Sequence, residues 1–278
     1  MTFDPKTPEN MERTINYLEA KIKILENNHN NGEKDEVLFQ IEVFYLNETG
    51  QYDKLGGMLG DEALEGIQLL SVETRDIITD INTISKAPPK YKSDCMIKMN
   101  KTEYIYYISI KSKNHANPAI LNHTPRTAKV FQPDGILNKY VDALDIILKE
   151  YIDKRTDKLI GEDISITKLE CLKDEPLIYS EFVNVLSYFV FEGSGKGDSM
   201  CKPNSVVYYE NGKISFIKCR NIEEKKGYIE SIYNEIVLSL RDKGMPKQIC
   251  EYCTPWVFND YNSDGTIKYK GSLHIRIN

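Results

Sequence analysis

The chain has 278 residues, 41% hydrophobic and 28% charged, with a net charge of −6, a composition that excludes extensive disorder. No stretch reaches the roughly 18 consecutive apolar residues of a membrane span, and the N-terminal residues lack the features of a secretory signal. We therefore expect a soluble, cytoplasmic protein with no membrane partner. Its richness in Asn, Lys, Ile and Tyr points to a bacterium or a virus-infected host cell as the source.

The N-terminal third is predicted to be mainly helical. Residues 7–28 have an amphipathic helical pattern, carried by Met11, Ile15, Leu18, Ile22 and Leu25. Residues 36–47 fit a helix or a strand equally well. Apolar residues at helical spacing predict one or two helices within residues 60–87, ending before Pro88.

The period changes after this proline, and β-branched and aromatic residues dominate. Residues 95–99 and 103–111 are predicted to form a β-hairpin, because three polar residues separate two strand-like runs. The later predicted elements are a helix over 135–154, a helix over 180–192, a hairpin over 205–219, a surface helix over 223–242 and a strand pair over 263–278.

These elements predict an α/β fold with a mixed β-sheet core flanked by helices. We expect three parts: an acidic helical N-terminal region over 1–85, a central core over 86–220, and a C-terminal αβ addition over 221–278. The C-terminal helix and hairpin are expected to pack on the core as one unit.

Charge is distributed unevenly along the chain. Residues 1–85 carry 17 acids and 7 bases, whereas residues 86–131 carry 9 bases and only two acids, Asp94 and Glu103. A basic segment of this kind suits a polyanionic partner, and a solvated basic surface is the alternative interpretation.

The predicted hairpin brings a carboxylate close to a lysine. Asp94 could bind a hard cation such as Mg²⁺ through oxygen, and the backbone carbonyl of Ile110 could supply a second oxygen from the neighbouring strand. Lys111 would then orient a water molecule for attack on a phosphate, while the cation neutralises the developing charge. This pattern predicts a phosphodiesterase site.

Asp94 together with Ser109-Ile110-Lys111 resembles the motif of the PD-(D/E)XK nuclease superfamily, within it the type II restriction endonucleases. The resemblance covers residues 91–131 and implies Mg²⁺-dependent hydrolysis of double-stranded DNA at a short specific sequence. It departs from the family pattern at Ser109, where the family has an acid; some restriction enzymes carry a polar residue there that acts through water, and we expect Ser109 to hold the water shell of the metal. A homodimer suits a two-strand cut at a palindrome.

A helix before the strand could supply the missing carboxylate, as it does in several members of this group. Glu73, Asp76 and Asp80 lie on the helix predicted within residues 60–87, and Glu73 is the first candidate for an additional metal ligand. The alternative for each is a solvated surface acid.

A cluster of hydrogen-bond donors follows the lysine, and the resemblance extends to this position. Such side chains hold phosphates and read base edges. The candidate DNA-binding residues are Lys113, Asn114, His115, Asn117, Asn122, His123, Arg126 and Lys129.

Two alternatives to a nuclease follow from the sequence. The first is a catalytically inactive DNA-binding relative, in which Ser109 marks a lost site. The second is an interaction module with structural zinc, because Cys250 and Cys253 have the spacing of a zinc half-site and Cys201 and Cys219 are candidates to complete it.

Overall fold

The computed structural model describes residues 4–114, 117–122, 127, 129–156, 163–193, 200–210, 213–241, 257–261 and 267–278. They form an α/β fold with one mixed sheet and one antiparallel sheet, which confirms the predicted fold class at this coarse level. The chain divides into two compact units, Met1–Ala116 with Met200–Glu224, and Asn117–Ser199 with Lys225–Asn278. The three-part division expected at residues 85 and 220 stays a prediction.

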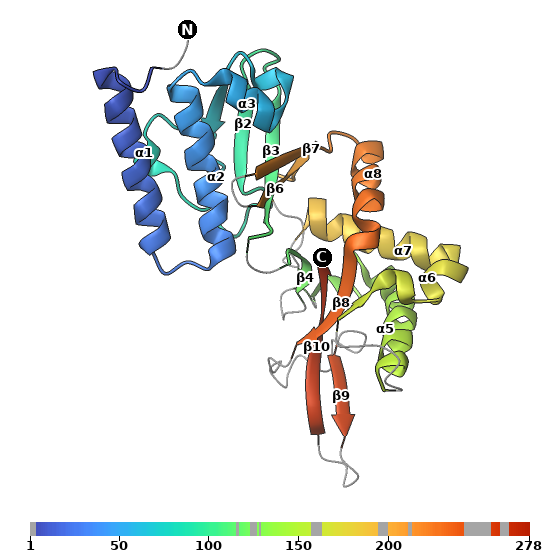
Figure 1. The fold of residues 1–278 in the computed structure, drawn as a ribbon. Coiled ribbons are helices and arrows are strands. Elements are labelled where there is room, and N and C mark those ends of the chain that lie inside the picture. The colour runs from blue at the N-terminus through green and yellow to red at the C-terminus, as the bar shows by residue number, and fades with distance from the viewer. Residues whose placement is uncertain are drawn as a thin grey trace. The chain divides into compact units, whose positions relative to one another are not determined.

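The first unit contains a mixed five-stranded sheet with the order β1-β2-β3-β6-β7 (Figure 1). Neighbouring strands are antiparallel except for β3 and β6, which are parallel. Its strands are β1 (Ile67–Leu70), β2 (Cys95–Met99), β3 (Ile105–Ser112), β6 (Ser205–Glu210) and β7 (Lys213–Lys218). The predicted hairpins over 95–111 and 205–219 are therefore confirmed as β2–β3 and β6–β7, with the turn at 211–212 outside the described residues.

Helix α2 is the central helix of the first unit. It packs against α1 on one side and against β1 and β3 on the other (Figure 1). The helices are α1 (Pro8–Glu26), α2 (Asn31–Glu48) and α3 (Tyr52–Leu59), with short 3₁₀ turns η1 (Asp61–Ala63) and η2 (Ile81–Thr83).

Burial explains why the sequence left α2 ambiguous. The helix begins after Asn30, whose side chain accepts a hydrogen bond from the Glu33 N–H. It buries residues on almost every side, from Asp35 and Val37 through Phe39 and Gln40 to Leu46. A helix buried all round has no amphipathic period, so its pattern resembles that of a strand.

The second unit is built on an antiparallel sheet with the order β4-β10-β8-β5, and β9 also pairs with β10. Its strands are β4 (Ala119–Asn122), β5 (Asp163–Ser165), β8 (Ile236–Arg241), β9 (Val257–Tyr261) and β10 (Ile267–Ile277). Its helices are α5 (Val141–Thr156), α6 (Cys171–Asp174), α7 (Pro176–Ser187) and a π-helical turn η6 (Tyr188–Glu192), with 3₁₀ turns η3 (Lys129–Phe131), η4 (Asn138–Tyr140), η5 (Ile166–Lys168) and η7 (Tyr233–Glu235). Helix α8 (Ile222–Ile232) crosses the boundary between the units.

Two predicted helices are wrong in whole or in part. Residues 60–87 form β1, two 3₁₀ turns and loops, because Gly66 adopts a positive φ of 85° and the following residues pair with β2. Residues 223–242 form a helix only to Ile232, after which the chain enters β8 and pairs with β10. In both places tertiary strand pairing outweighs helical periodicity.

Within the described part of the chain, no helix combines the length and the apolar character needed to cross a bilayer.

The core of the first unit lies between α2 and the sheet, and its packing can be tested at Ile97. This side chain is 0% exposed on β2. Ile97→Ala is expected to lower the free energy of unfolding by about 2–5 kcal/mol, because it leaves a cavity in a packed core. Chemical denaturation of the full chain measures this loss.

Ile222→Ala is the matched control, because the same truncation removes a side chain that is 84% exposed. It is expected to change the free energy of unfolding by less than about 0.5 kcal/mol. Equal losses in the two variants would contradict the assigned core.

Candidate active site

The site is built around an irregularity at the start of β2. The strand register pairs Cys95 with Ile108, yet the N–H of Asp94 also donates to the carbonyl of Ile108, at 2.8 Å. Two consecutive residues therefore stand opposite one residue, which is the pattern of a β-bulge. A bulge redirects the side chain that it carries, here the carboxylate of Asp94.

The chain leaves β3 just before this bulge. Lys92 and Ser93 donate their backbone N–H groups to Met200 and Cys201, so they are not paired with β3. The N–H of Ile110 consequently has no partner on the β2 backbone, and it donates to Oδ2 of Asp94 at 2.6 Å. The Asp94 carboxylate thus fills the gap between the diverging strands.

The same gap receives the carbonyl of Ile110. The N–H and C=O groups of one strand residue point to the same side of the strand. Because the N–H of Ile110 points at Asp94, its carbonyl faces the same side. The Ile110 carbonyl therefore faces the same side of β3 as the Asp94 carboxylate. That the two oxygens hold one cation stays a prediction.

Helix α2 contributes a second carboxylate, Glu36, which the sequence did not identify as a site residue. Burial, and after it the negative charge of Asp94, raises the pKa of Glu36 to about 8. Burial likewise raises the pKa of Asp94, although the charge of Lys111 and the Ile110 N–H oppose this shift. Two neighbouring carboxylates with raised pKa values favour the binding of a proton or a cation between them.

The beginning of α2 is fixed to the end of β3, which holds Glu36 in place. Asp35, 5% exposed, accepts hydrogen bonds from the Ser112 hydroxyl and from the side-chain amide of Asn114 at 2.9 Å. Farther along the helix, Gln40 donates to the backbone carbonyl of Asp94 at 3.5 Å. These contacts join α2 to both strands of the site.

Lysines surround the two carboxylates. The charges of Lys111 and Lys86 lower the pKa values of both Glu36 and Asp94, and the charge of Lys92 lowers that of Asp94. Burial, followed by the charge of Lys111, lowers the pKa of Lys92 to about 7. Lys111 is on the strand face opposite to Ile108 and Ile110, because side chains alternate along β3, yet it is the charged group that lowers the pKa of Asp94 most.

Ser109 lies on the same strand face as Lys111 and is 2% exposed. Among the described residues, the groups that bond to the Asp94 carboxylate or oppose the rise of its pKa are the Ile110 N–H and the charges of three lysines, and Ser109 is not among them. Its predicted role in holding the water shell of a metal stays a prediction.

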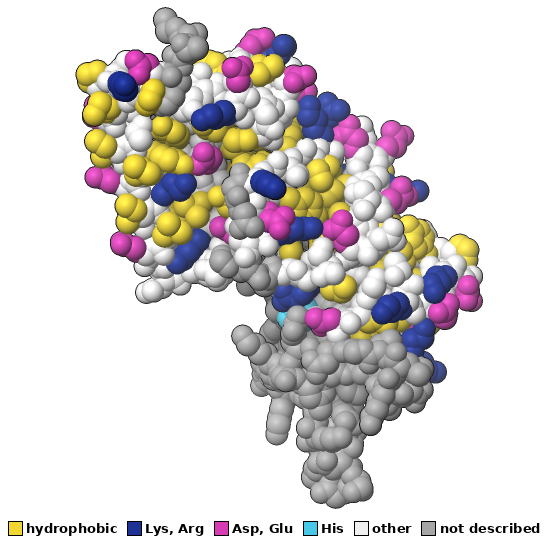
Figure 2. Space-filling view, in the orientation of Figure 1, with side chains coloured by type: hydrophobic (Ala, Val, Ile, Leu, Met, Phe, Trp, Pro, Cys, Tyr) yellow, Lys and Arg dark blue, Asp and Glu magenta, His cyan; other side chains and the backbone are white. Residues whose placement is uncertain are grey.

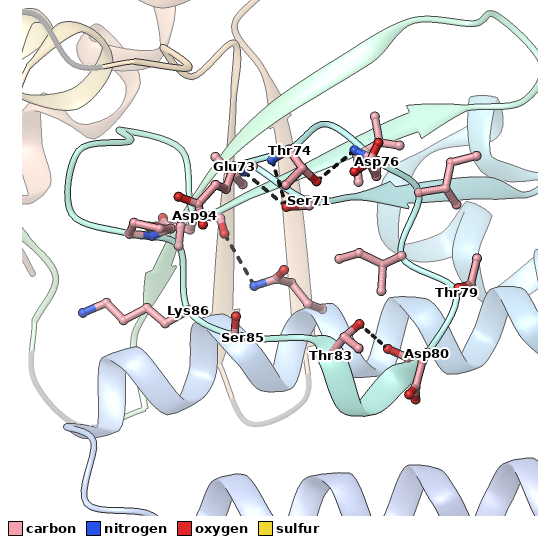
Figure 3. A pocket seen from close by; sticks show the side chains of 17 residues that line it. Ser71, Glu73, Thr74, Asp76, Thr79, Asp80, Thr83, Ser85, Lys86 and Asp94 are labelled. Atoms are coloured by element: carbon pink, nitrogen blue, oxygen red, sulfur yellow. Dashed lines mark hydrogen bonds between the residues drawn. The ribbon is translucent and has the colours of Figure 1, made fainter.

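A pocket of about 310 Å³ opens beside Asp94 (Figure 3). Asp94 and Gln40 line it together with Lys86 and with the segment that follows β1. Four carboxylates line the pocket, those of Glu73, Asp76, Asp80 and Asp94. This concentration of negative charge attracts cations towards Asp94.

The predicted position of Glu73 is wrong. It was expected on a helix, but it lies in the turn after β1, where it forms an ion pair with Lys90 at 3.3 Å with its side chain 55% exposed. It lines the same pocket as Asp94. The helix whose carboxylate acts electrostatically on Asp94 is α2, earlier in the chain than expected, and the residue is Glu36.

Several lysines of the basic segment, residues 86–131, form ion pairs with acidic residues of the same unit. Four of its lysines pair with acids at N–O distances up to 3.3 Å: Lys86 with Glu33, Lys90 with Glu73, Lys98 with Glu103 and Lys101 with Glu65. The charges of Lys92 and Lys111 instead lower the pKa of Asp94.

The candidate DNA-binding residues divide between the units. In the first unit, Lys113 lies 5.0 Å from the ring centroid of Tyr208, and Asn114 bonds to Asp35. In the second unit, Asn117 donates to Asn278, while Asn122 and Lys129 are exposed. His115, His123 and Arg126 lie outside the described residues.

The proposed zinc ligands are likewise only partly described. The thiols of Cys201 and Cys219 donate to the backbone carbonyls of Val72 and Ile217, each at 3.9 Å. Cys250 and Cys253 lie outside the described residues. Among the side chains that the structure describes, no group of three or more His, Cys, Asp or Glu is arranged to hold a metal. A cation at Asp94 would therefore depend on two carboxylates supplemented by a backbone carbonyl and water.

Comparisons of the chain with protein-family models, with curated proteins and with solved structures gave no match. A functional assignment therefore depends on the chemistry of this site alone.

The raised pKa of Glu36 predicts a pH-dependent stability in metal-free buffer. Between the ordinary value of 4.5 and about 8, the folded protein binds a proton that the unfolded chain has lost, so stability falls as pH rises. Glu36→Gln cannot titrate, and at pH 8 it is expected to be more stable than the wild type by on the order of 1 kcal/mol. Denaturation in EDTA at pH 5 and pH 8 measures this difference.

Glu48→Gln is the control, because it makes the same change of charge at an exposed position of the same helix. A Glu36→Gln variant with the pH dependence of the wild type would show that Glu36 is not buried beside Asp94.

Proposed function

We propose that the protein is a Mg²⁺-dependent endonuclease that hydrolyses phosphodiester bonds of double-stranded DNA. The observation that supports this most strongly is the placement of Asp94 in the gap between β2 and β3, bonded to the Ile110 N–H, with Glu36 and Lys111 acting on it. Two carboxylates, a carbonyl and a lysine are the groups that this hydrolysis needs.

The residues of the gap fit a hard divalent cation. Asp94 and Glu36 would hold it through carboxylate oxygens, and Ile110 through its carbonyl, since oxygen ligands suit Mg²⁺. Burial is the main cause of the raised pKa values of both carboxylates, because it disfavours their charged forms, and nearby lysine charges oppose it. When bound, the cation neutralises negative charge that develops on the phosphate in the transition state.

The lysines supply the remaining chemistry. In hydrolysis, a water oxygen forms a bond to phosphorus while the bond from phosphorus to one ester oxygen breaks, and a proton of the water ends on the departing oxygen. Lys111 would orient the attacking water by hydrogen bonding. Lys92, whose backbone is fixed to Met200 and whose pKa is lowered to about 7, is partly protonated at neutral pH. In its protonated form it would add positive charge beside the phosphate.

The resemblance to type II restriction endonucleases gives the finer form of this proposal: cleavage at a short specific sequence by a homodimer. The family motif has an acid where this chain has Ser109. In this proposal Glu36 of α2 takes the place of that acid, so that the site still has two carboxylates, Asp94 and Glu36. This favours an active enzyme over the catalytically inactive DNA-binding relative.

Incubation of plasmid DNA with the purified protein and Mg²⁺ tests the proposal. Discrete fragments are expected, and Asp94→Asn, Lys111→Ala and Glu36→Gln are each expected to lower the cleavage rate by at least about 100-fold. Retardation of DNA in a gel without Mg²⁺ is expected to persist in all three variants, because each side chain acts mainly in the chemical step.

Glu73→Gln provides the matched control for Glu36→Gln, since it removes the charge of a carboxylate that lines the pocket beside Asp94 but pairs with Lys90. It is expected to retain cleavage within about threefold. Gel retardation without cleavage by the wild type would support the inactive relative, and full activity of Asp94→Asn would refute the assigned site.

A further inference from the structure

Helix α1 already has a partner on its inner face. Tyr17 stacks on Tyr45 of α2 with 4.2 Å between ring centroids, and Ala20 is 4% exposed. Lys21 also points this way, with its ammonium 3.7 Å from the carboxylate of Glu42. These contacts fix the orientation of α1 on α2, so its opposite face is the one left to solvent.

That outer face carries a continuous apolar stripe. Its members are separated by four, three, four and three residues, and each is between 50% and 54% exposed: Met11, Ile15, Leu18, Ile22 and Leu25. Figure 2 shows hydrophobic side chains in a line along the outer side of α1. At 1.5 Å per residue the stripe is about 21 Å long.

Single exposed apolar side chains are ordinary, but this stripe has the regularity of a helix–helix interface. The alternation of three and four residues is the heptad repeat of a coiled-coil seam, in which such side chains insert between those of a facing helix. The stripe is also self-complementary, because an apolar row meets an identical apolar row across a two-fold axis.

The residues beside the stripe select an orientation. One flank carries Glu12, Glu19 and Glu26, and the other carries Thr14 and Lys21. In an antiparallel pair each flank meets its own counterpart, so the three glutamates would repel one another. In a parallel pair the glutamate flank meets the Thr14 and Lys21 flank, which removes this repulsion; Lys21 remains 33% exposed beside Glu42.

We propose that α1 pairs in parallel with α1 of a second copy of this chain, through the stripe from Met11 to Leu25. The observations that carry this proposal belong to α1 and are independent of the active site. Only the purpose of this dimer rests on the proposed function. If the protein is an endonuclease, a dimer would bring two hydrolytic sites to one DNA duplex.

Sedimentation equilibrium of the full chain tests the pairing. The wild type is expected to be a dimer at about 50 μM, and Ile15→Glu with Ile22→Glu is expected to raise the dissociation constant at least about 100-fold. Each introduced charge would be buried in the seam without a partner. Both positions are more than half exposed within one chain, so circular dichroism should be unchanged.

Asn16→Glu with Lys23→Glu is the matched control. It places two acids at exposed positions that directly follow Ile15 and Ile22 in sequence but lie outside the stripe. It is expected to leave the dimer within about threefold of the wild-type dissociation constant. A monomeric wild type, as expected if the stripe contacts another part of its own chain, would overturn the proposal. A dimer that survives Ile15→Glu with Ile22→Glu would overturn it as well.

The parallel orientation of the two α1 helices can be tested separately by disulfide cross-linking. Ile22→Cys is expected to form a disulfide between copies under mild oxidation, because position 22 faces itself only in a parallel pair; wild-type protein controls for the native cysteines. Absence of this cross-link in a dimer would overturn the parallel arrangement. DNA cleavage or nicking by a monomer would leave the proposed hydrolysis standing and refute the dimer, so the two failures are distinguishable.

Discussion

The hydrogen bond from the Ile110 N–H to the Asp94 carboxylate is the interaction on which the candidate site depends. It exists because the bulge at Asp94 and the departure of Lys92 and Ser93 towards Met200 and Cys201 leave the Ile110 N–H without a backbone partner. An unpaired backbone group inside a fold is costly. The carboxylate satisfies this group and is thereby held between the strands, where a fully paired sheet would leave no room for a ligand.

Charge determines what this gap can bind. The negative charges of Glu36 and Asp94 act on each other in a partly desolvated site, and the lysines around them compensate this repulsion only in part. Such a site is stabilised by a proton at low pH or by a cation at higher pH. Lysines beside a cation that still exposes a coordination position form an environment suited to a phosphate diester.

Sequence patterns predicted the part of this site that lies on strands. The alternation of residue types along the sequence predicted strands β2 and β3. The excess of basic residues around them singled out Asp94 and Lys111 as candidate site residues. They could not predict Glu36, because α2 is buried on nearly all sides and its periodicity does not distinguish a helix from a strand. They misassigned Glu73, because the isoleucines after β1 have helical spacing although the chain there forms turns.

The amphipathic pattern of α1 shows a different limit. It predicted the helix correctly, but a pattern of apolar residues does not state what covers them. In the structure the stripe faces outward, while Tyr17 and Ala20 face α2. The physical reason is that aromatic stacking and a small residue allow close packing of α1 on α2, which leaves the larger aliphatic side chains for another surface.

In the proposed enzyme, Glu36, Asp94 and the Ile110 carbonyl would share one divalent ion. The most direct measurement is an anomalous difference map from crystals of the full chain equilibrated with Mn²⁺, which replaces Mg²⁺ and scatters anomalously. One strong peak is expected within about 2.5 Å of oxygens from both carboxylates. Density only elsewhere, or none at a saturating concentration, would contradict it.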